Sequence, residues 1–198
     1  MNYSNVFIAS PNILAQVWGL RFAGELLSVQ GAGSGWNPSR AGVRHFTLQS
    51  RVEKTDELAS DQKKVSILLV EDNPADAGLV RMALEEHGVE GDIFVVTDGE
   101  TAIQLIGDLD AQPVDCLDLA IIDLNLPKKP GRVVLERIRR SERCKAIPVV
   151  ILTSSDAEQD RADAVRLGAN HYLRKPSKLE EFLDLGTVFK QILGGAPQ

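Results

Sequence analysis

From Ser66 onward, short apolar runs alternate with longer stretches in which apolar residues recur at helical spacing. A short run made largely of Val, Ile, Leu or Phe is typical of a strand that is buried on both faces of a sheet. The runs that predict strands are residues 66–70, 93–96, 117–122, 147–152 and 171–173.

Each run is followed by a stretch with helical periodicity, and local signals mark the helix ends. Asp98 can cap a helix, Ser155 to Glu158 fits a capping box, and Gly88 and Gly168 are natural stops. The helices are predicted over residues 74–87, 99–109, 131–140, 155–167 and 179–192. Strict alternation of strand and helix predicts an α/β fold, a doubly wound parallel sheet with helices on both faces.

The first 64 residues do not share this pattern, so we divide the chain into an extension, 1–64, and a domain, 65–198. Apolar residues between Ile13 and Leu27 have partial helical spacing, and the glycine-rich stretch 31–35 has the composition of a flexible spacer. Three interpretations stay open: a poorly ordered tail, a partner-binding helix, or translation from a start codon upstream of the true one. The first is the default expectation.

Composition narrows the function classes. A net charge of −6 argues against the broad basic surface of a DNA-binding protein. No apolar run reaches the roughly 18 residues that a membrane helix requires, and the N-terminus does not resemble a signal peptide, so we expect a cytoplasmic protein. Cys116 and Cys144 form no CxxC pair and are expected to be reduced thiols. The arginines at 137, 139, 140 and 143 are expected to form a solvated helix face.

Chemically versatile side chains follow the predicted strands. Glu71 and Asp72 end the first, Asp123 the third, Thr153 the fourth, and Lys175 follows the fifth. The carboxyl ends of parallel strands meet at one edge of the sheet, so these groups should converge. Crowded carboxylates need a cation, and an all-oxygen site suits Mg²⁺. With a lysine alongside, the set has what is needed to form an aspartyl phosphate.

The motifs themselves resemble those of the response-regulator receiver family. They are Leu-Leu-Val-Glu-Asp-Asn at 68–73, Asp-Leu-Asn-Leu-Pro at 123–127, Val-Ile-Leu-Thr-Ser at 150–154 and Tyr-Leu-Arg-Lys-Pro at 172–176. The likeness extends from Ser66 to about Leu193 and is strongest to the single-domain branch associated with phytochrome kinases. It implies a flavodoxin-like five-stranded sheet of order 2-1-3-4-5.

The resemblance also implies residue roles. Asp123 would be the phosphoacceptor, and Lys175 would contact the phosphoryl group. Thr153 and Tyr172 would form the switch, and Asn125 and Ser155 would influence dephosphorylation. Mg²⁺ would be held by Glu71, Asp72, Asp123 and the backbone carbonyl of Asn125. Pro176 would follow a cis peptide bond.

The same likeness implies partners. The phosphoryl donor would be a histidine kinase, of the phytochrome type or within a phosphorelay, and a homodimer would be in keeping with this branch. We expect no direct DNA binding, no membrane partner, and no enzymatic activity beyond self-phosphorylation and slow autodephosphorylation.

Three other functions fit the residues less well. A haloacid-dehalogenase-like phosphatase needs a second carboxylate two positions after its nucleophile, where this chain has Asn125. A flavodoxin needs a phosphate-binding loop after the first strand, but Glu71 and Asp72 would repel a phosphate. A docking protein that works without phosphorylation would not need the complete acidic, threonine and lysine set.

Overall fold

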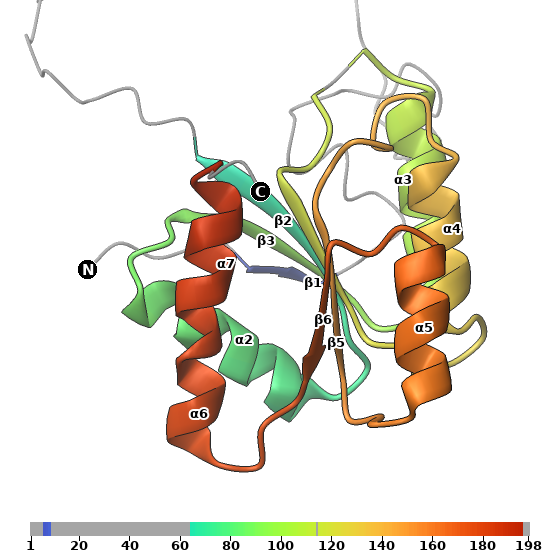
Figure 1. Cartoon of the computed structure of the whole chain (residues 1–198). Coiled ribbons are helices and arrows are strands. Elements are labelled where there is room, and N and C mark those ends of the chain that lie inside the picture. The colour runs from blue at the N-terminus through green and yellow to red at the C-terminus, as the bar shows by residue number, and fades with distance from the viewer. Residues whose placement is uncertain (1–5, 9–63, 114, 196–198) are drawn as a thin grey trace, which may run out of the picture. The chain divides into compact units, whose positions relative to one another are not determined.

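The computed structural model describes residues 6–8 (backbone), 64–113 and 115–195 (Figure 1). The strands are β1 Val6–Ile8, β2 Val65–Val70, β3 Gly91–Val96, β4 Leu119–Ile122, β5 Val149–Thr153 and β6 His171–Arg174. The helices are α2 Pro74–Glu86, α3 Gly99–Asp110, α4 Gly131–Arg139, α5 Glu158–Arg166, α6 Leu179–Leu183 and α7 Leu185–Leu193. None of these described helices is both long and apolar enough to span a membrane.

The sheet has the predicted topology. Its strand order is β1-β3-β2-β4-β5-β6 with parallel pairing throughout, so the five predicted strands follow the order 2-1-3-4-5. At the centre, Ile67 of β2 pairs with Ile93 of β3 on one side and with Leu119 of β4 on the other. The fold prediction is therefore confirmed.

Helices cover both faces of this sheet, as Figure 1 shows. On one face, Leu68, Phe94 and Ile122 pack with the apolar sides of α3, α4 and α5. On the other, Leu69 and Ile121 pack with α2, α6 and α7. Successive residues of a strand point to opposite faces of the sheet. Because helices cover both faces, apolar residues are needed at positions on either side of the central strands.

The pattern did not predict β1. Its residues pair with β3, Val6 opposite Ile93 and Ile8 opposite Val95, so β1 is the edge strand of the sheet. The partly helical stretch expected between 13 and 27 lies outside the described residues, and so does the spacer at 31–35. The division of the chain at residue 64 stays a prediction.

Local side-chain bonds explain where several helices begin. Asn73 caps α2 by accepting a hydrogen bond from the N–H of Ala75, and Asp98 caps α3 by accepting one from Thr101. The predicted capping box at 155–158 is wrong, because Ala157 occupies the N-cap position of α5. Ser155 lies two residues too early to serve as the N-cap.

The predicted final helix is divided into α6 and α7 at Asp184. Asp184 has a weak helix preference, and Gly186 follows two residues later. A side chain at Gly186 would collide with the carbonyl of Ala83, 2.0 Å from the position of its Cβ. The glycine therefore permits α7 to pack directly against α2.

The prediction of reduced cysteines is wrong in this structure, where Cys116 and Cys144 form a disulfide with a Cα–Cα distance of 5.5 Å. Cys116 lies in the loop before β4, and Cys144 lies between α4 and β5. The sequence did not indicate this pair, because 28 positions separate the two residues and only the packing of α4 onto the sheet brings them together.

The arginine cluster is also more than a solvated face. Arg137 forms an ion pair with Asp110 of α3 at 2.7 Å. Arg139 donates to the carbonyls of Lys145, Ile147 and Gly168 and to the side chain of Asn170. Arg140 keeps the expected character, since it is largely exposed beside Glu136 on the same helix.

Candidate functional site

The site lies at the carboxyl ends of the strands, as predicted. Glu71 and Asp72 directly follow β2, Asp123 directly follows β4, and Lys175 directly follows β6. Each strand is held by backbone bonds to its neighbours, and the N–H of Asp123 continues this ladder to the carbonyl of Val70. The sheet therefore fixes the backbone from which these side chains project.

Lys175 is the centre of the charged cluster. Its Nζ lies 2.7 Å from Oδ2 of Asp123, 2.7 Å from Oε2 of Glu71 and 2.9 Å from Oδ2 of Asp76. The lysine side chain is only 10% exposed. Burial alone would lower its pKa, but hydrogen bonds to Asp123, Glu71 and Asp76 outweigh burial and raise the pKa above its ordinary value. Lys175 therefore stays an ammonium ion.

Three acids also meet one another. Glu71, Asp72 and Asp123 each offer a carboxylate oxygen, and these oxygens all lie within 4.8 Å of one another. Glu71 and Asp123 are buried, whereas Asp72 is exposed. Burial raises the pKa of Glu71, and Lys175 opposes that rise. An all-oxygen donor set with one exposed member suits a hard divalent cation that keeps some of its water.

The two buried carboxylates are already oriented by backbone groups. Oε1 of Glu71 accepts from the N–H of Asn73 at 3.1 Å, and Oδ1 of Asp123 accepts from the N–H of Asn125 at 3.0 Å. Both oxygens of Glu71 and both oxygens of Asp123 therefore have protein partners, whereas Asp72 is the exposed member of the three acids. The side chain of Asn125 is exposed beside them.

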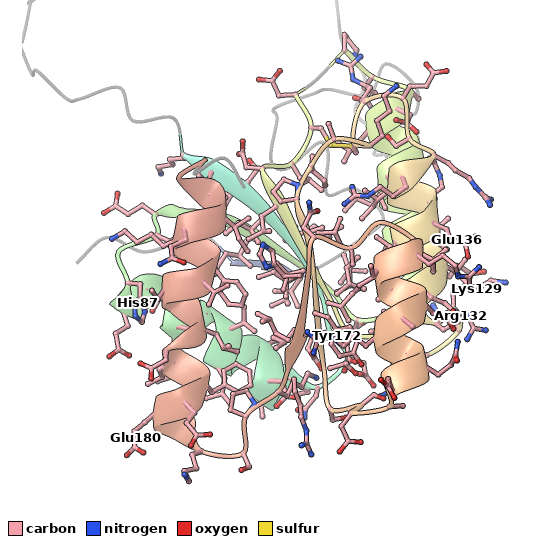
Figure 2. The ribbon with its side chains drawn as sticks, viewed as in Figure 1. His87, Lys129, Arg132, Glu136, Tyr172 and Glu180 are labelled. Carbon is pink, nitrogen blue, oxygen red and sulfur yellow. A yellow bond between two sulfur atoms is a disulfide. The ribbon has the colours of Figure 1, made fainter. Side chains whose placement is uncertain are left out.

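Thr153 and Tyr172 are connected through Ser155, because each of them forms a hydrogen bond with the backbone of that residue. Thr153 is fully buried at the end of β5, and its Oγ1 accepts from the N–H of Ser155 at 3.3 Å. The Tyr172 hydroxyl donates to the carbonyl of Ser155 at 3.1 Å. Figure 2 labels Tyr172, which packs on the side of β6 that faces α5. Burial raises the pKa of Tyr172, so the hydroxyl keeps its proton.

Sequence reasoning missed Asp76. This residue lies in the first turn of α2, and its contact with Lys175 joins positions 99 apart in the chain. A weak signal was present, because a helix that starts at Pro74 places residue 76 in a turn next to the acids that end β2. Nothing in that spacing identifies Lys175 as the partner.

The expectation of a cis bond before Pro176 is wrong, since no peptide bond among the described residues is cis. Trans is the ordinary form of an X–Pro bond unless the surroundings lock the other isomer. The backbone continues from β6 through Lys175, whose N–H donates to the carbonyl of Thr153 at 2.8 Å.

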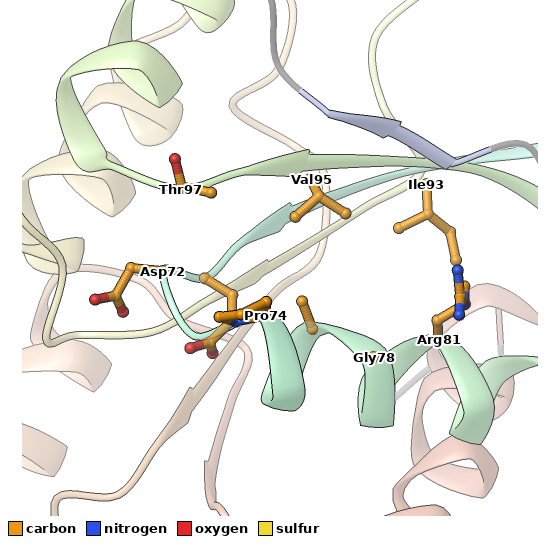
Figure 3. Close-up of a pocket in the computed structure, with 9 residues that line it drawn as sticks. Asp72, Pro74, Gly78, Arg81, Ile93, Val95 and Thr97 are labelled. Atoms are coloured by element: carbon orange, nitrogen blue, oxygen red, sulfur yellow. The ribbon is translucent and has the colours of Figure 1, made fainter.

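An apolar pocket of about 350 Å³ adjoins the acidic cluster. It lies between α2 and β3, with Asp72 and Pro74 towards one end and Arg81 and Ile93 towards the other (Figure 3). Most of its wall is provided by small or aliphatic side chains, among them Ala77 and Val95. Its place next to Asp72 puts an apolar surface directly beside the charged site.

Comparison with known proteins agrees with this geometry. The family described as "Response regulator receiver domain" matches residues 67–185. Response regulator Rcp1 of Synechocystis sp. is 37% identical over 65% of this chain and 84% of its own length. The probable methanogenesis regulatory protein FilR2 of Methanothrix harundinacea is 41% identical over 58% of this chain and 74% of its own length.

Solved structures share the fold. The phosphorylated cyanobacterial phytochrome response regulator RcpA is 33% identical, with a TM-score of 0.61 over 68% of this chain and 97% of its own. The Mn²⁺-bound form of Rcp1 is 32% identical, with a TM-score of 0.59 over 68% of this chain and 97% of its own. The receiver domain of the Pseudomonas aeruginosa sensor histidine kinase PA1611, 29% identical with a TM-score of 0.54 over 67% of this chain and 99% of its own, has a magnesium ion in its active-site cleft.

Receivers similar to this chain thus bind divalent metal, and the acids in this structure gather as such an ion requires. With the fold, the strand-end residues and the family match in agreement, the chain belongs to the response regulator receiver domain family of two-component signalling.

Proposed function

We propose that this protein is a response regulator. Its Asp123 accepts a phosphoryl group from a histidine kinase, and this modification switches a protein-interaction surface. One observation carries the proposal: the carboxylate of Asp123 lies 2.7 Å from the ammonium of Lys175 and within 4.8 Å of the other two acids. On this reading the chain is a phosphoacceptor, rather than an enzyme that turns over a separate substrate.

Magnesium is the proposed cofactor. Glu71 and Asp72 would hold the ion, directly or through water, together with Asp123 and the backbone carbonyl of Asn125. The bound ion would supply positive charge opposite the phosphoryl oxygens. The exposure of Asp72 supports this assignment, because Mg²⁺ usually keeps several waters.

The chain's own residues would carry the transfer. An oxygen of Asp123 forms a bond to phosphorus while the bond between phosphorus and the donor histidine breaks, and the bonding electrons return to the imidazole. Lys175 then pairs with a phosphoryl oxygen instead of the aspartate oxygen it contacts here. Little further chemistry is needed, since phosphoryl transfer depends mainly on positioning and charge.

The proposed switch uses Thr153 and Tyr172. A new phosphoryl oxygen would draw the Thr153 hydroxyl towards it, and this would disturb the bond that Ser155 donates to Thr153. Ser155 also accepts the bond from Tyr172, so the change would reach β6 and the adjacent α5. Asn125 and Ser155, on either side of the phosphoryl group, are proposed to set its lifetime.

The proposed donor is a histidine kinase of the phytochrome class or a member of a phosphorelay. Similar proteins carry phytochrome in their names, namely RcpA and the bacteriophytochrome response regulator RtBRR, which is 34% identical with a TM-score of 0.55. The acidic net charge of −6 favours protein partners over direct DNA contact. We further propose a cytoplasmic location and a homodimer, in keeping with the resemblance to this branch.

Acetyl phosphate with Mg²⁺ tests the proposal without a kinase. We expect the purified chain to gain the mass of one phosphoryl group, stable in acid and labile in alkali, and Asp123→Asn to gain none. Asp72→Asn should require a higher Mg²⁺ concentration, because it loses a charged ligand. Asp108→Asn, an exposed aspartate on α3 away from the cluster, is the matched control and should behave like wild type.

A mass gain that persists in Asp123→Asn, or that is independent of Mg²⁺, would contradict the proposal. Absence of any gain in wild type, together with normal folding, would favour a docking protein that works without phosphorylation.

A further inference from the structure

Asp76 contacts the reactive lysine without belonging to the acidic cluster. Its Oδ2 accepts a hydrogen bond from Nζ of Lys175 at 2.9 Å, and its side chain is 23% exposed. The three acids whose oxygens meet within 4.8 Å are Glu71, Asp72 and Asp123. Asp76 is therefore a partner of the lysine rather than a member of that group.

The Lys175 ammonium has as many carboxylate partners as it has N–H groups. A lysine side chain has three N–H donors and no acceptor. Glu71, Asp76 and Asp123 each place one oxygen within 2.9 Å of Nζ. The bonds to Asp76 and Asp123 have hydrogen-bond geometry, and Glu71 adds an ion pair at 2.7 Å. Glu71 follows β2, Asp76 lies in α2 and Asp123 follows β4, so the three partners come from different parts of the fold.

Only one of these partners changes during phosphoryl transfer. Once an oxygen of Asp123 is bonded to phosphorus, the negative charge resides on the phosphoryl oxygens, and one N–H of Lys175 has to follow it. The lysine stem is flexible, with four methylene groups that can adopt many rotamers. An ammonium held by Asp123 alone would lose its position at the moment when that contact breaks.

We propose that Asp76 is a positioning residue of the phosphoacceptor site. With Glu71 it anchors the ammonium of Lys175, so that the third N–H can exchange the Asp123 oxygen for a phosphoryl oxygen while Nζ stays in place. The inference rests on the proposed function. The role proposed for Asp76 affects the rate of phosphoryl transfer, whereas the role proposed for Asp72 affects the affinity for the metal ion.

The test compares Asp76→Ala with Asp76→Asn, whose amide oxygen can still accept a bond from Lys175. We expect Asp76→Ala to be phosphorylated by acetyl phosphate about ten-fold more slowly at saturating Mg²⁺, as loss of a charge-assisted hydrogen bond implies. Asp76→Asn should retain most of the rate. Neither variant should shift the half-saturating Mg²⁺ concentration as Asp72→Asn does. Glu100→Ala, which also removes a first-turn carboxylate, should match wild type.

An independent measurement follows the lysine itself. The ¹H–¹⁵N signal of the Lys175 ammonium should exchange slowly with water in wild type and in Asp76→Asn, and quickly in Asp76→Ala. A wild-type rate in Asp76→Ala, equal losses in both variants, or an unchanged ammonium signal would overturn this inference. Wild type that folds, shows the slow ammonium signal and takes up no phosphoryl group would overturn the proposed function instead.

Discussion

At the scale of single residues, Asp98 combines two stabilising roles at the start of α3. Its side chain accepts bonds from the N–H and the hydroxyl of Thr101 at 2.8 and 2.9 Å, and it forms an ion pair with Lys128 at 2.9 Å. The Lys128 side chain is 54% exposed, so solvent weakens that pair and the cap provides most of the effect. Burial would raise the pKa of Asp98, but the bonds from Thr101 and Lys128 outweigh it and lower the pKa.

This pKa has a definite consequence for stability. A carboxylate with a depressed folded-state pKa stabilises the fold above its unfolded pKa, about 4, and stops doing so as the pH falls through the folded value. Asp98→Ala, which removes the cap, should lower the free energy of unfolding by about 1 kcal/mol at neutral pH. The deficit relative to wild type should shrink as the pH falls below about 4. Urea unfolding at neutral pH and below about pH 4 measures this deficit. A deficit that does not depend on pH would contradict the lowered pKa of Asp98.

At the scale of elements, Arg139 holds the end of α4 against two loops. Its guanidinium donates to the carbonyls of Lys145, Ile147 and Gly168 and to the Asn170 side chain, at 2.8–3.0 Å. The N–H of Val149 also donates to Asn170, so α4, the start of β5 and the start of β6 share one network. Partial burial lowers the pKa of Arg139, although an arginine stays charged at any ordinary pH.

Lysine cannot reproduce this planar fork, so Arg139→Lys should destabilise the protein by about 2 kcal/mol. Arg140→Lys is the matched control on the same helix, because the Arg140 side chain is 78% exposed and its pair with Glu136 is a surface pair. It should change stability by less than about 0.5 kcal/mol. Thermal unfolding of both variants tests the difference, and equal melting temperatures would show that the network contributes nothing.

At the scale of the whole molecule, the sequence predicted what depends on local pattern. The strands, most helix boundaries and the gathering of Asp72, Asp123 and Lys175 follow from periodicity and the topology of parallel sheets. The bond from Lys175 to Asp76 could not be foreseen, because it joins distant segments whose side chains meet only after packing. The disulfide and the network of Arg139 were missed for the same physical reason.

The disulfide provides a test at this scale. A cross-link between positions 28 apart should stabilise the protein by about 2–4 kcal/mol, chiefly by restricting the unfolded chain. We expect a reductant to lower the urea midpoint of wild type by a corresponding amount. The double variant Cys116→Ala, Cys144→Ala should be insensitive to the reductant, and equal midpoints for wild type with and without reductant would contradict the assignment.

The same bond closes a covalent ring from Cys116 to Cys144 that contains β4, Asp123 and α4. The exposed stretch around Lys128 belongs to this ring. Cleavage there would therefore release no fragment, and the aspartate would remain tethered to both halves of the domain until the sulfur–sulfur bond was reduced.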